Sequence, residues 1–210
     1  MQQIKKFQRQ SREAGDTLIE VLFAFAVLSL VIIGALSIMN QGSIASQRSL
    51  ETTLVKEEIN GQVSALNFLH DAYIAAYQPG ADFDVNTAAG QWQKMVSSLS
   101  STTPSTYGGG STCPTTQPEG SFVLDPVTAT YQTNLQQAQT FAQLGYNGSN
   151  VFTESDGVWV EGIKSTTIET DVNKKNVTYI DFHVNACWPG PGSGPVMTIG
   201  TIVRLYEPVN

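Results

Sequence analysis

An apolar run at residues 18–39 constrains this chain more than any other feature. Its 22 residues contain no proline, and Glu20 is the only charged residue among them. At a rise of 1.5 Å per residue, about 20 helical residues cross a hydrocarbon core of ~30 Å. The run therefore predicts a membrane-spanning helix. A charge inside such a helix costs about 2.5–3.5 kcal/mol on insertion scales, which makes Glu20 a candidate functional residue.

The charges that precede the run predict its orientation. Four basic residues and one acidic residue lie ahead of it: Lys5, Lys6, Arg9, Arg12 and Glu13. The positive-inside bias places such a segment in the cytoplasm. No second apolar stretch of comparable length follows. We therefore expect a single-pass membrane protein whose ectodomain, after Asn40, lies outside.

Small residues stand before the apolar run, at Ala14 and Gly15, whereas a secretory signal peptide carries them after a shorter run. Gly15, the segment Thr17-Leu18-Ile19-Glu20-Val21-Leu22 and the following apolar run resemble the class III signal of type IV prepilins and pseudopilins. The resemblance covers about a fifth of the chain. The family usually places an apolar residue directly after the glycine, where this chain has Asp16. An uncleaved signal anchor, in which Glu20 reaches the membrane surface, is the alternative.

The resemblance implies that a prepilin peptidase cuts between Gly15 and Asp16 and that the new N-terminus at Asp16 is methylated. It also implies that Glu20 meets the N-terminal amine of a neighbouring subunit during filament assembly. The implied partners are other pilin subunits, the peptidase, the inner-membrane pilus assembly machinery and, before assembly, membrane lipid. The subunit would finally reside in an extracellular filament.

Length and charge limit the classes of function. The 210 residues suffice for one domain plus an anchor. Removal of residues 1–15 takes away four basic and one acidic side chain, which lowers the net charge from −7 to −10. Such acidity disfavours binding to phosphate backbones, so no nucleic-acid partner is expected.

Two cysteines, Cys113 and Cys187, both follow the membrane segment. In an oxidising compartment they can form one disulfide, which would close a loop of about 75 residues and stabilise the fold by ~4 kcal/mol. The spacing alone does not show that the two residues meet. His183 lies on the same strand face as Cys187 and offers a Cys–His site as the alternative. Catalytic zinc needs three protein ligands, however, and the only other histidine is His70.

The sequence Asp82-x-Asp84-x-Asn86 resembles the start of a calcium loop. Thr87 and Gln93 stand where such a loop needs glycine and glutamate. We therefore expect no metal and no other cofactor. Because no acid, base and nucleophile converge in the sequence, we also expect no enzymatic activity.

The apolar helix is expected to continue beyond the membrane, because no proline occurs between residues 16 and 78. Residues 16–40 would form the membrane or filament-core segment, and residues 41–78 an amphipathic continuation. An apolar stripe predicts the face that packs on a sheet; it consists of Leu50, Leu54, Ile59, Val63, Leu66, Leu69, Tyr73 and Tyr77. Polar residues are expected on the other faces, at Arg48, Glu51, Lys56, Glu57 and Gln62.

Residues 79–150 are rich in glycine, serine and threonine, which predicts a variable connecting region with little core of its own. Two short helices are expected within it, at about 87–99 and 129–144. Residues 151–210 predict antiparallel strands at 158–164, 177–187 and 196–206. Ile180, Phe182, Val184 and Ala186 would share one strand face. The predicted fold is α+β, with a long N-terminal helix packed on a C-terminal antiparallel sheet of about three or more strands, as in pilins.

The favoured function is a structural subunit of a type IV pilus-like filament, most closely a minor pilin. A pseudopilin of a type II secretion or DNA-uptake system is one alternative. A stand-alone membrane-anchored adhesin or binding module that never polymerises is an alternative of another class.

Overall fold

The computed structural model describes residues 13–99, 112–115, 118–168, 176–192 and 194–208. The side chains of residues 13–17, 167–168 and 176–177 lie outside this description. The chain divides into two compact units, residues 1–46 and 47–210, and helix α1 (Glu13–Ala76) runs through both.

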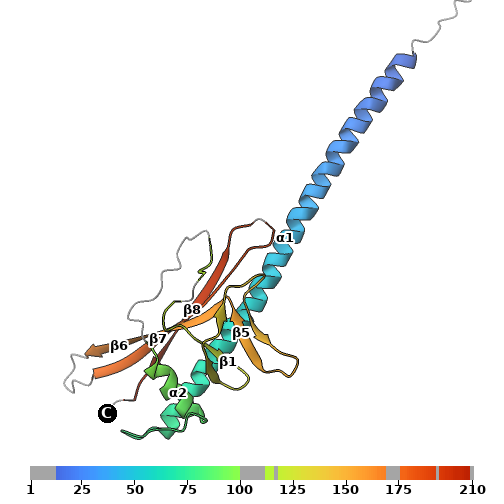
Figure 1. Cartoon of the computed structure of the whole chain (residues 1–210). Helices are drawn as coiled ribbons and strands as arrows, with labels where there is room; N and C mark the ends of the chain where they lie inside the picture. The colour runs from blue at the N-terminus through green and yellow to red at the C-terminus, as the bar shows by residue number, and fades with distance from the viewer. Residues whose placement is uncertain (1–12, 100–111, 116–117, 169–175, 193, 209–210) are drawn as a thin grey trace, which may run out of the picture. The chain divides into compact units, whose positions relative to one another are not determined.

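Helix α1 contains 64 residues and confirms the long helix predicted from the absence of proline (Figure 1). It ends at Ala76, three residues before Pro79, which can neither donate a backbone hydrogen bond nor continue the helix. Gly80 has a φ angle of 77°, a left-handed conformation that glycine adopts without steric cost. The backbone N–H of Ala81 donates to the Gln78 carbonyl at 3.0 Å. Residues 78–81 therefore form the turn that closes the helix.

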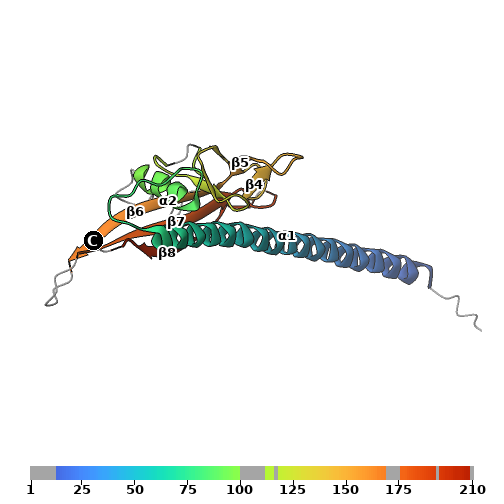
Figure 2. The ribbon, with the colours of Figure 1, turned by 90° about the horizontal axis from the view of Figure 1, so that it is seen from below.

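The C-terminal part of the chain forms a three-stranded antiparallel sheet, in agreement with the prediction. Its strands lie in the order β6 (Val158–Ile168), β7 (Asn176–Trp188) and β8 (Met197–Tyr206). Figures 1 and 2 show these strands side by side. The central strand alternates as expected, with four buried apolar side chains at Ile180, Phe182, Val184 and Ala186. One face of the sheet therefore belongs to the core.

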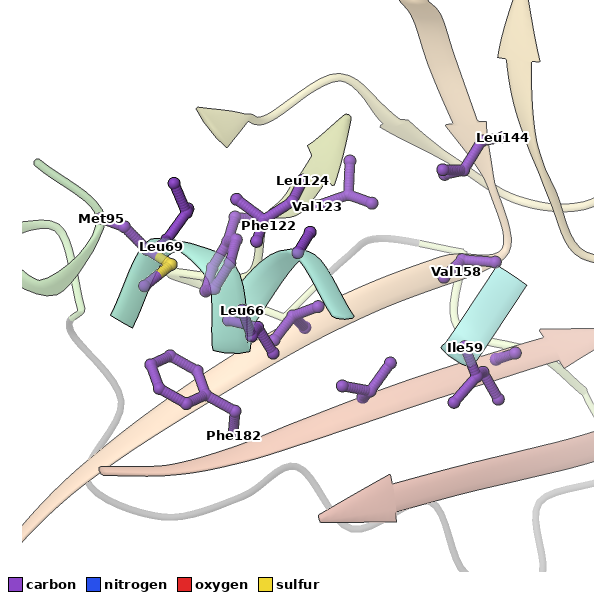
Figure 3. Close-up of a cluster of buried hydrophobic side chains, with 14 of the residues drawn as sticks. Ile59, Leu66, Leu69, Met95, Phe122, Val123, Leu124, Leu144, Val158 and Phe182 are labelled. Atoms are coloured by element: carbon purple, nitrogen blue, oxygen red, sulfur yellow. The ribbon is translucent and has the colours of Figure 1, made fainter. Parts of the chain in front are cut away.

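The core of residues 47–210 lies between this face of the sheet and helix α1. The buried apolar residues of the helix are Val55, Ile59, Ala65, Leu66 and Leu69. Figure 3 shows Leu66 and Leu69 among Met95, Phe122 and Phe182, which come from other elements. Each fully buried leucine contributes about 1.5–3 kcal/mol relative to an exposed one. The α+β layout, with the helix packed on antiparallel strands, is confirmed.

The predicted stripe on the helix is wrong at its N-terminal end. Leu50 and Leu54 are exposed, whereas Glu51 and Val55 are buried. The residues that lie on the buried face of α1 include Glu51, Val55, Gln62, Leu66 and Leu69. Because one residue corresponds to about 100° of helix rotation, Leu50 and Leu54 point away from this face. Burial of the two polar residues on the face requires hydrogen-bond partners, and both have them.

The side chain of Gln62 forms two hydrogen bonds with the backbone of one strand residue, Leu124. The Gln62 side chain is fully buried, and Nε2 donates to the carbonyl of Leu124 at 2.6 Å. The backbone N–H of Leu124, in strand β1 (Val123–Asp125), donates back to Oε1 at 2.8 Å. This reciprocal pair imitates a hydrogen-bonded residue pair of an antiparallel ladder. The predictions that Glu51 and Gln62 lie on outer faces of the helix are therefore wrong.

The first helix expected in the connecting region is confirmed as α2 (Ala88–Ser97). Thr87 is its N-cap, and Thr87 Oγ1 accepts a hydrogen bond from the backbone N–H of Gly90 at 3.2 Å. This bond satisfies one of the backbone donors that every helix N-terminus leaves free.

The second expected helix, at 129–144, is wrong. The segment forms strand β2 (Thr130–Gln132), strand β3 (Leu135–Gln136) and the beginning of strand β4 (Gln143–Tyr146). Strand β2 pairs with β1, whereas β3 and β4 flank β5 (Phe152–Asp156), with β3 parallel and β4 antiparallel to it. Ala129 has a φ angle of 52°, which is incompatible with an α-helix. Pairing in the β1–β2 and β4–β5 hairpins, and of β3 with β5, outweighs the weak helix propensity of the segment.

Residues 79–150 also contribute more to the core than their composition predicts. Phe122, Val123 and Leu124 are fully buried, and Trp92 and Met95 of α2 are buried with them. The expectation of little core in this region is therefore wrong. All five residues belong to the same core cluster as the buried residues of α1 and of the sheet.

Candidate functional site

The apolar part of α1 is exposed on every side of the helix. All side chains from residue 18 to residue 43 are exposed. The large apolar ones are Leu18, Ile19, Val21, Leu22, Phe23, Phe25, Val27, Leu28, Leu30, Val31, Ile32, Ile33, Leu36, Ile38 and Met39. A helix that is apolar all round needs an apolar surrounding, either lipid or other protein. By length and composition, this helix is able to cross a membrane.

Glu20 is an exposed carboxylate within this apolar surface. Phe23 and Ala24, three and four positions further along, lie on the same helix face. The chain has no charged residue between Glu20 and Arg48. In an apolar surrounding, a positive partner for Glu20 therefore has to come from outside residues 21–47.

Ser29 shows how a polar group is accommodated on the same surface. Its hydroxyl donates to the carbonyl of Phe25, one turn earlier, at 2.7 Å. The bond satisfies the hydroxyl within the helix, so this residue needs no water. A carboxylate has no hydrogen to donate in this way. Glu20 is therefore the group on this surface that most needs an external partner.

Gly15 and Asp16 lie in the first turn of α1. The side chain of Asp16 lies outside the described residues, as does the segment 1–12 with its four basic residues. Cleavage between these two residues and methylation of Asp16 remain predictions.

The expected disulfide between Cys113 and Cys187 is present, with the two Cα atoms 5.6 Å apart. It joins the connecting region to strand β7. The two cysteines and Trp159 form a small buried cluster on which Leu135 and Val196 pack. Since the sulfur of Cys187 is bonded to that of Cys113, a Cys–His site with His183 is excluded.

His70 and Asp84, considered above as metal ligands, make structural contacts. His70 Nε2 lies 2.9 Å from the backbone carbonyl of Tyr206, and the imidazole packs edge-on against Trp92 with ring centroids 5.0 Å apart. The carboxylate of Asp84 accepts hydrogen bonds from the backbone and side-chain nitrogens of Asn86, both at 2.9 Å. Among the described residues, no three His, Cys, Asp or Glu side chains are grouped to hold a metal.

Two buried carboxylates were not expected from the sequence. Trp188 Nε1 donates to Glu51 at 3.2 Å, and Trp159 Nε1 donates to Glu161 at 2.8 Å. Each pair joins an indole N–H to a carboxylate in the interior, where an unpartnered polar group costs ~1–3 kcal/mol. The partners of the Glu51–Trp188 pair are 137 positions apart, so no local sequence pattern marks that pair. The Glu51–Trp188 pair joins α1 to strand β7, whereas the Trp159–Glu161 pair lies within strand β6.

A third buried carboxylate, Asp125, organises the turn after β1. It accepts hydrogen bonds from the Val127 backbone N–H at 3.0 Å, the Thr128 hydroxyl at 2.6 Å and the Tyr146 hydroxyl at 3.1 Å. Burial and the adjacent carboxylate raise the pKa of Tyr146. Burial also raises the pKa of the nearby Glu58 carboxyl, which a backbone hydrogen bond from Leu144 partly offsets.

Among the described side chains of the sheet, Arg204 and Asp181 form an exposed ion pair. Arg204 donates to both carboxylate oxygens of Asp181, from Nε at 2.7 Å and from Nη2 at 2.8 Å. These bonds hold the pKa of Asp181 below its ordinary value. The guanidinium carbon also lies 4.1 Å from the centre of the Tyr179 ring. Because Arg204 is exposed, the pair contributes little to stability.

Of the sequence-predicted site residues, the structure brings Cys113 and Cys187 together, and it leaves Glu20 exposed on an apolar helix. No family model, curated protein or solved structure matches this chain.

Proposed function

We propose that this chain is a subunit of a type IV pilus-like filament, of the minor-pilin kind, with no enzymatic activity. The proposal rests on one observation: a helix surface that is apolar on all sides and carries a single carboxylate, Glu20. Lipid covers such a surface while the subunit waits in the membrane. Neighbouring helices of the same kind cover it in a filament.

Cleavage between Gly15 and Asp16 would create a new positively charged amine four residues before Glu20. In an apolar surrounding, Glu20 would attract the corresponding amine of a neighbouring copy. At an effective dielectric constant of ~20, two unit charges 4 Å apart attract each other by about 4 kcal/mol. Apolar packing is non-directional, so this pair would determine the axial position of one copy against the next.

The ectodomain supports an outside location. A buried disulfide between Cys113 and Cys187 is typical of proteins that fold in oxidising compartments. The orientation that follows, with a cytoplasmic N-terminus, agrees with the basic residues ahead of the helix.

N-terminal mass analysis of protein sheared from the cell surface tests cleavage and location together. We expect a chain that begins at Asp16 and carries a methylated amine. Surface protein that retains residues 1–15 would refute the proposal and favour a stand-alone membrane anchor.

A second experiment tests Glu20 itself. In Glu20→Ala, we expect normal leader removal and a loss of filament incorporation of more than about tenfold, because an unpaired buried charge costs several kcal/mol. Ser29→Ala is the matched control, since it removes a polar group of the same helix whose hydroxyl is satisfied internally. Normal incorporation of Glu20→Ala would contradict the assigned role of the carboxylate.

A further inference from the structure

An open groove lies between α1 and strand β8. Its volume is about 320 Å³, room for about ten water molecules at ~30 Å³ each. Apolar side chains dominate its walls: Ile59 and Val63 from the helix, Ile199 and Val203 from the strand. Strand β8 is the last strand of its sheet, so the groove lies at a sheet edge. Water in such a groove is easily displaced by an apolar group.

Lys56 and Asn60 contribute polar atoms to the groove. Lys56 is exposed, and no described carboxylate lies within ion-pair distance of its ammonium. Residues 47–210 contain 7 basic and 15 acidic side chains, a net charge of −8. The groove therefore offers a free positive charge on a mainly acidic unit. Its complement is an aliphatic side chain with a carboxylate beside it.

The chain itself carries such a group, in the loop before α2. Val85 is 53% exposed although its side chain is fully apolar, and Asp82 and Asp84 beside it are exposed as well. The loop is well ordered by hydrogen bonds: Phe83 N–H donates to Gln93 Oε1 at 3.1 Å, and Gln91 Nε2 donates to the Val85 carbonyl at 2.5 Å. Val85 is thus a fixed projection that does not line the groove of its own copy.

We propose that the groove between α1 and β8 receives Val85 of a second copy of this chain, with Asp82 of that copy next to Lys56. The inference rests on the proposed function. The contact joins two different surfaces, the groove of one copy and the Val85 loop of the next, so the interface is heterologous. Such an interface leaves a free patch at each end and continues indefinitely unless the rotation closes a ring. An ectodomain contact of this type would add to the contacts between the apolar helices.

Cross-linking in assembled material tests the contact. One copy carries Thr201→Cys at the groove and a co-expressed copy carries Val85→Cys; a short bis-maleimide then joins only free thiols and leaves the disulfide intact. We expect at least tenfold more cross-linked dimer than with the matched control Val127→Cys. Val127 is 72% exposed and projects from the turn after β1, but it has no exposed carboxylate beside it. Equal cross-linking from Val85 and Val127 would overturn the inference.

Exchanging the charges of Lys56 and Asp82 provides a second test of the contact. Lys56→Glu in the groove copy is expected to reduce the Thr201–Val85 cross-link at least tenfold, and Asp82→Lys in the other copy is expected to restore it. Failure of restoration, with both variants folded by tryptophan fluorescence, would also overturn the inference.

Ser37→Cys in both copies reports the packing of the apolar helices separately. Cross-links at Ser37 without a Thr201–Val85 cross-link would overturn the groove contact and leave the proposed function standing. Absence of both cross-links would overturn both proposals.

Discussion

Replacing Gln62 with methionine isolates the energetic contribution of one buried amide. Methionine has nearly the same length and volume as glutamine but can neither donate nor accept a strong hydrogen bond. In the native structure the amide makes two bonds to the backbone of Leu124, at 2.6 and 2.8 Å. Gln62→Met therefore leaves the core filled and removes only these two bonds.

The expected loss follows from the groups left behind. The N–H and the carbonyl of Leu124 would both be buried without a partner on that side, at ~1–3 kcal/mol each. Burial of a more apolar side chain recovers part of this cost. We expect a net destabilisation of ~2–4 kcal/mol, a large fraction of a typical stability of ~5–15 kcal/mol. For a unit of this size, the melting temperature would fall by about 5–15 °C.

Urea unfolding of the full-length protein in detergent measures this loss. Trp92, Trp159 and Trp188 are all buried within residues 47–210, so their fluorescence reports the unfolding of that unit. Gln78→Leu is the control, because Gln78 is exposed just beyond the end of α1. A loss below ~0.5 kcal/mol in Gln62→Met, or an equal loss in the control, would refute the reasoning about reciprocal bonding.

Three further predictions concern residues 47–210. Because burial raises the pKa of Glu58 above its unfolded value, the contribution of this group to stability is greatest below the unfolded pKa and is lost as the pH rises through the folded pKa. Glu58→Gln should therefore stabilise the protein at pH 7 and have less effect at pH 4 in the same urea assay; a larger gain at pH 4 would contradict this sign. Replacing Cys113 and Cys187 with serine should cost ~2–5 kcal/mol, and reducing agent should lower the stability of the wild type comparably while leaving the double variant unchanged. Thr87→Ala removes the N-cap of α2 and should cost ~1 kcal/mol, whereas Thr87→Ser should lose much less.

The strands β6 to β8 illustrate what local sequence predicts well. Residues such as Ile180, Phe182 and Val184 alternate with polar ones, and this period of two defines which strand face is buried. The same kind of local reasoning predicted α2 near its observed ends. It was wrong at residues 129–144, because the spacing of alanine, glutamine and leucine there suits a helix in isolation. The segment instead pairs with β1 and β5, two strands that are close in sequence, and the helical spacing of its residues does not reveal this pairing.

Among the residues proposed to take part in assembly, some can likewise be recognised from local sequence and others cannot. Glu20 stands out in the sequence because a lone charge in an apolar run is anomalous whatever the rest of the chain does. The groove at Lys56 and the projection of Val85 could not be recognised from sequence, since each depends on how α1, β8 and the loop before α2 pack. Leu50 and Leu54 show the same limit, because their apolar character alone does not reveal which face of α1 the sheet covers.

The sequence by itself determined the long apolar helix, its lone carboxylate and the alternating strands, because these depend on residues within a few positions of one another. Only the tertiary structure decided which polar side chains are buried. Gln62 binds a residue 62 positions away, and Glu51 binds one 137 positions away. A buried polar group is stable only when such a partner is in place, and the partner is brought there by the fold.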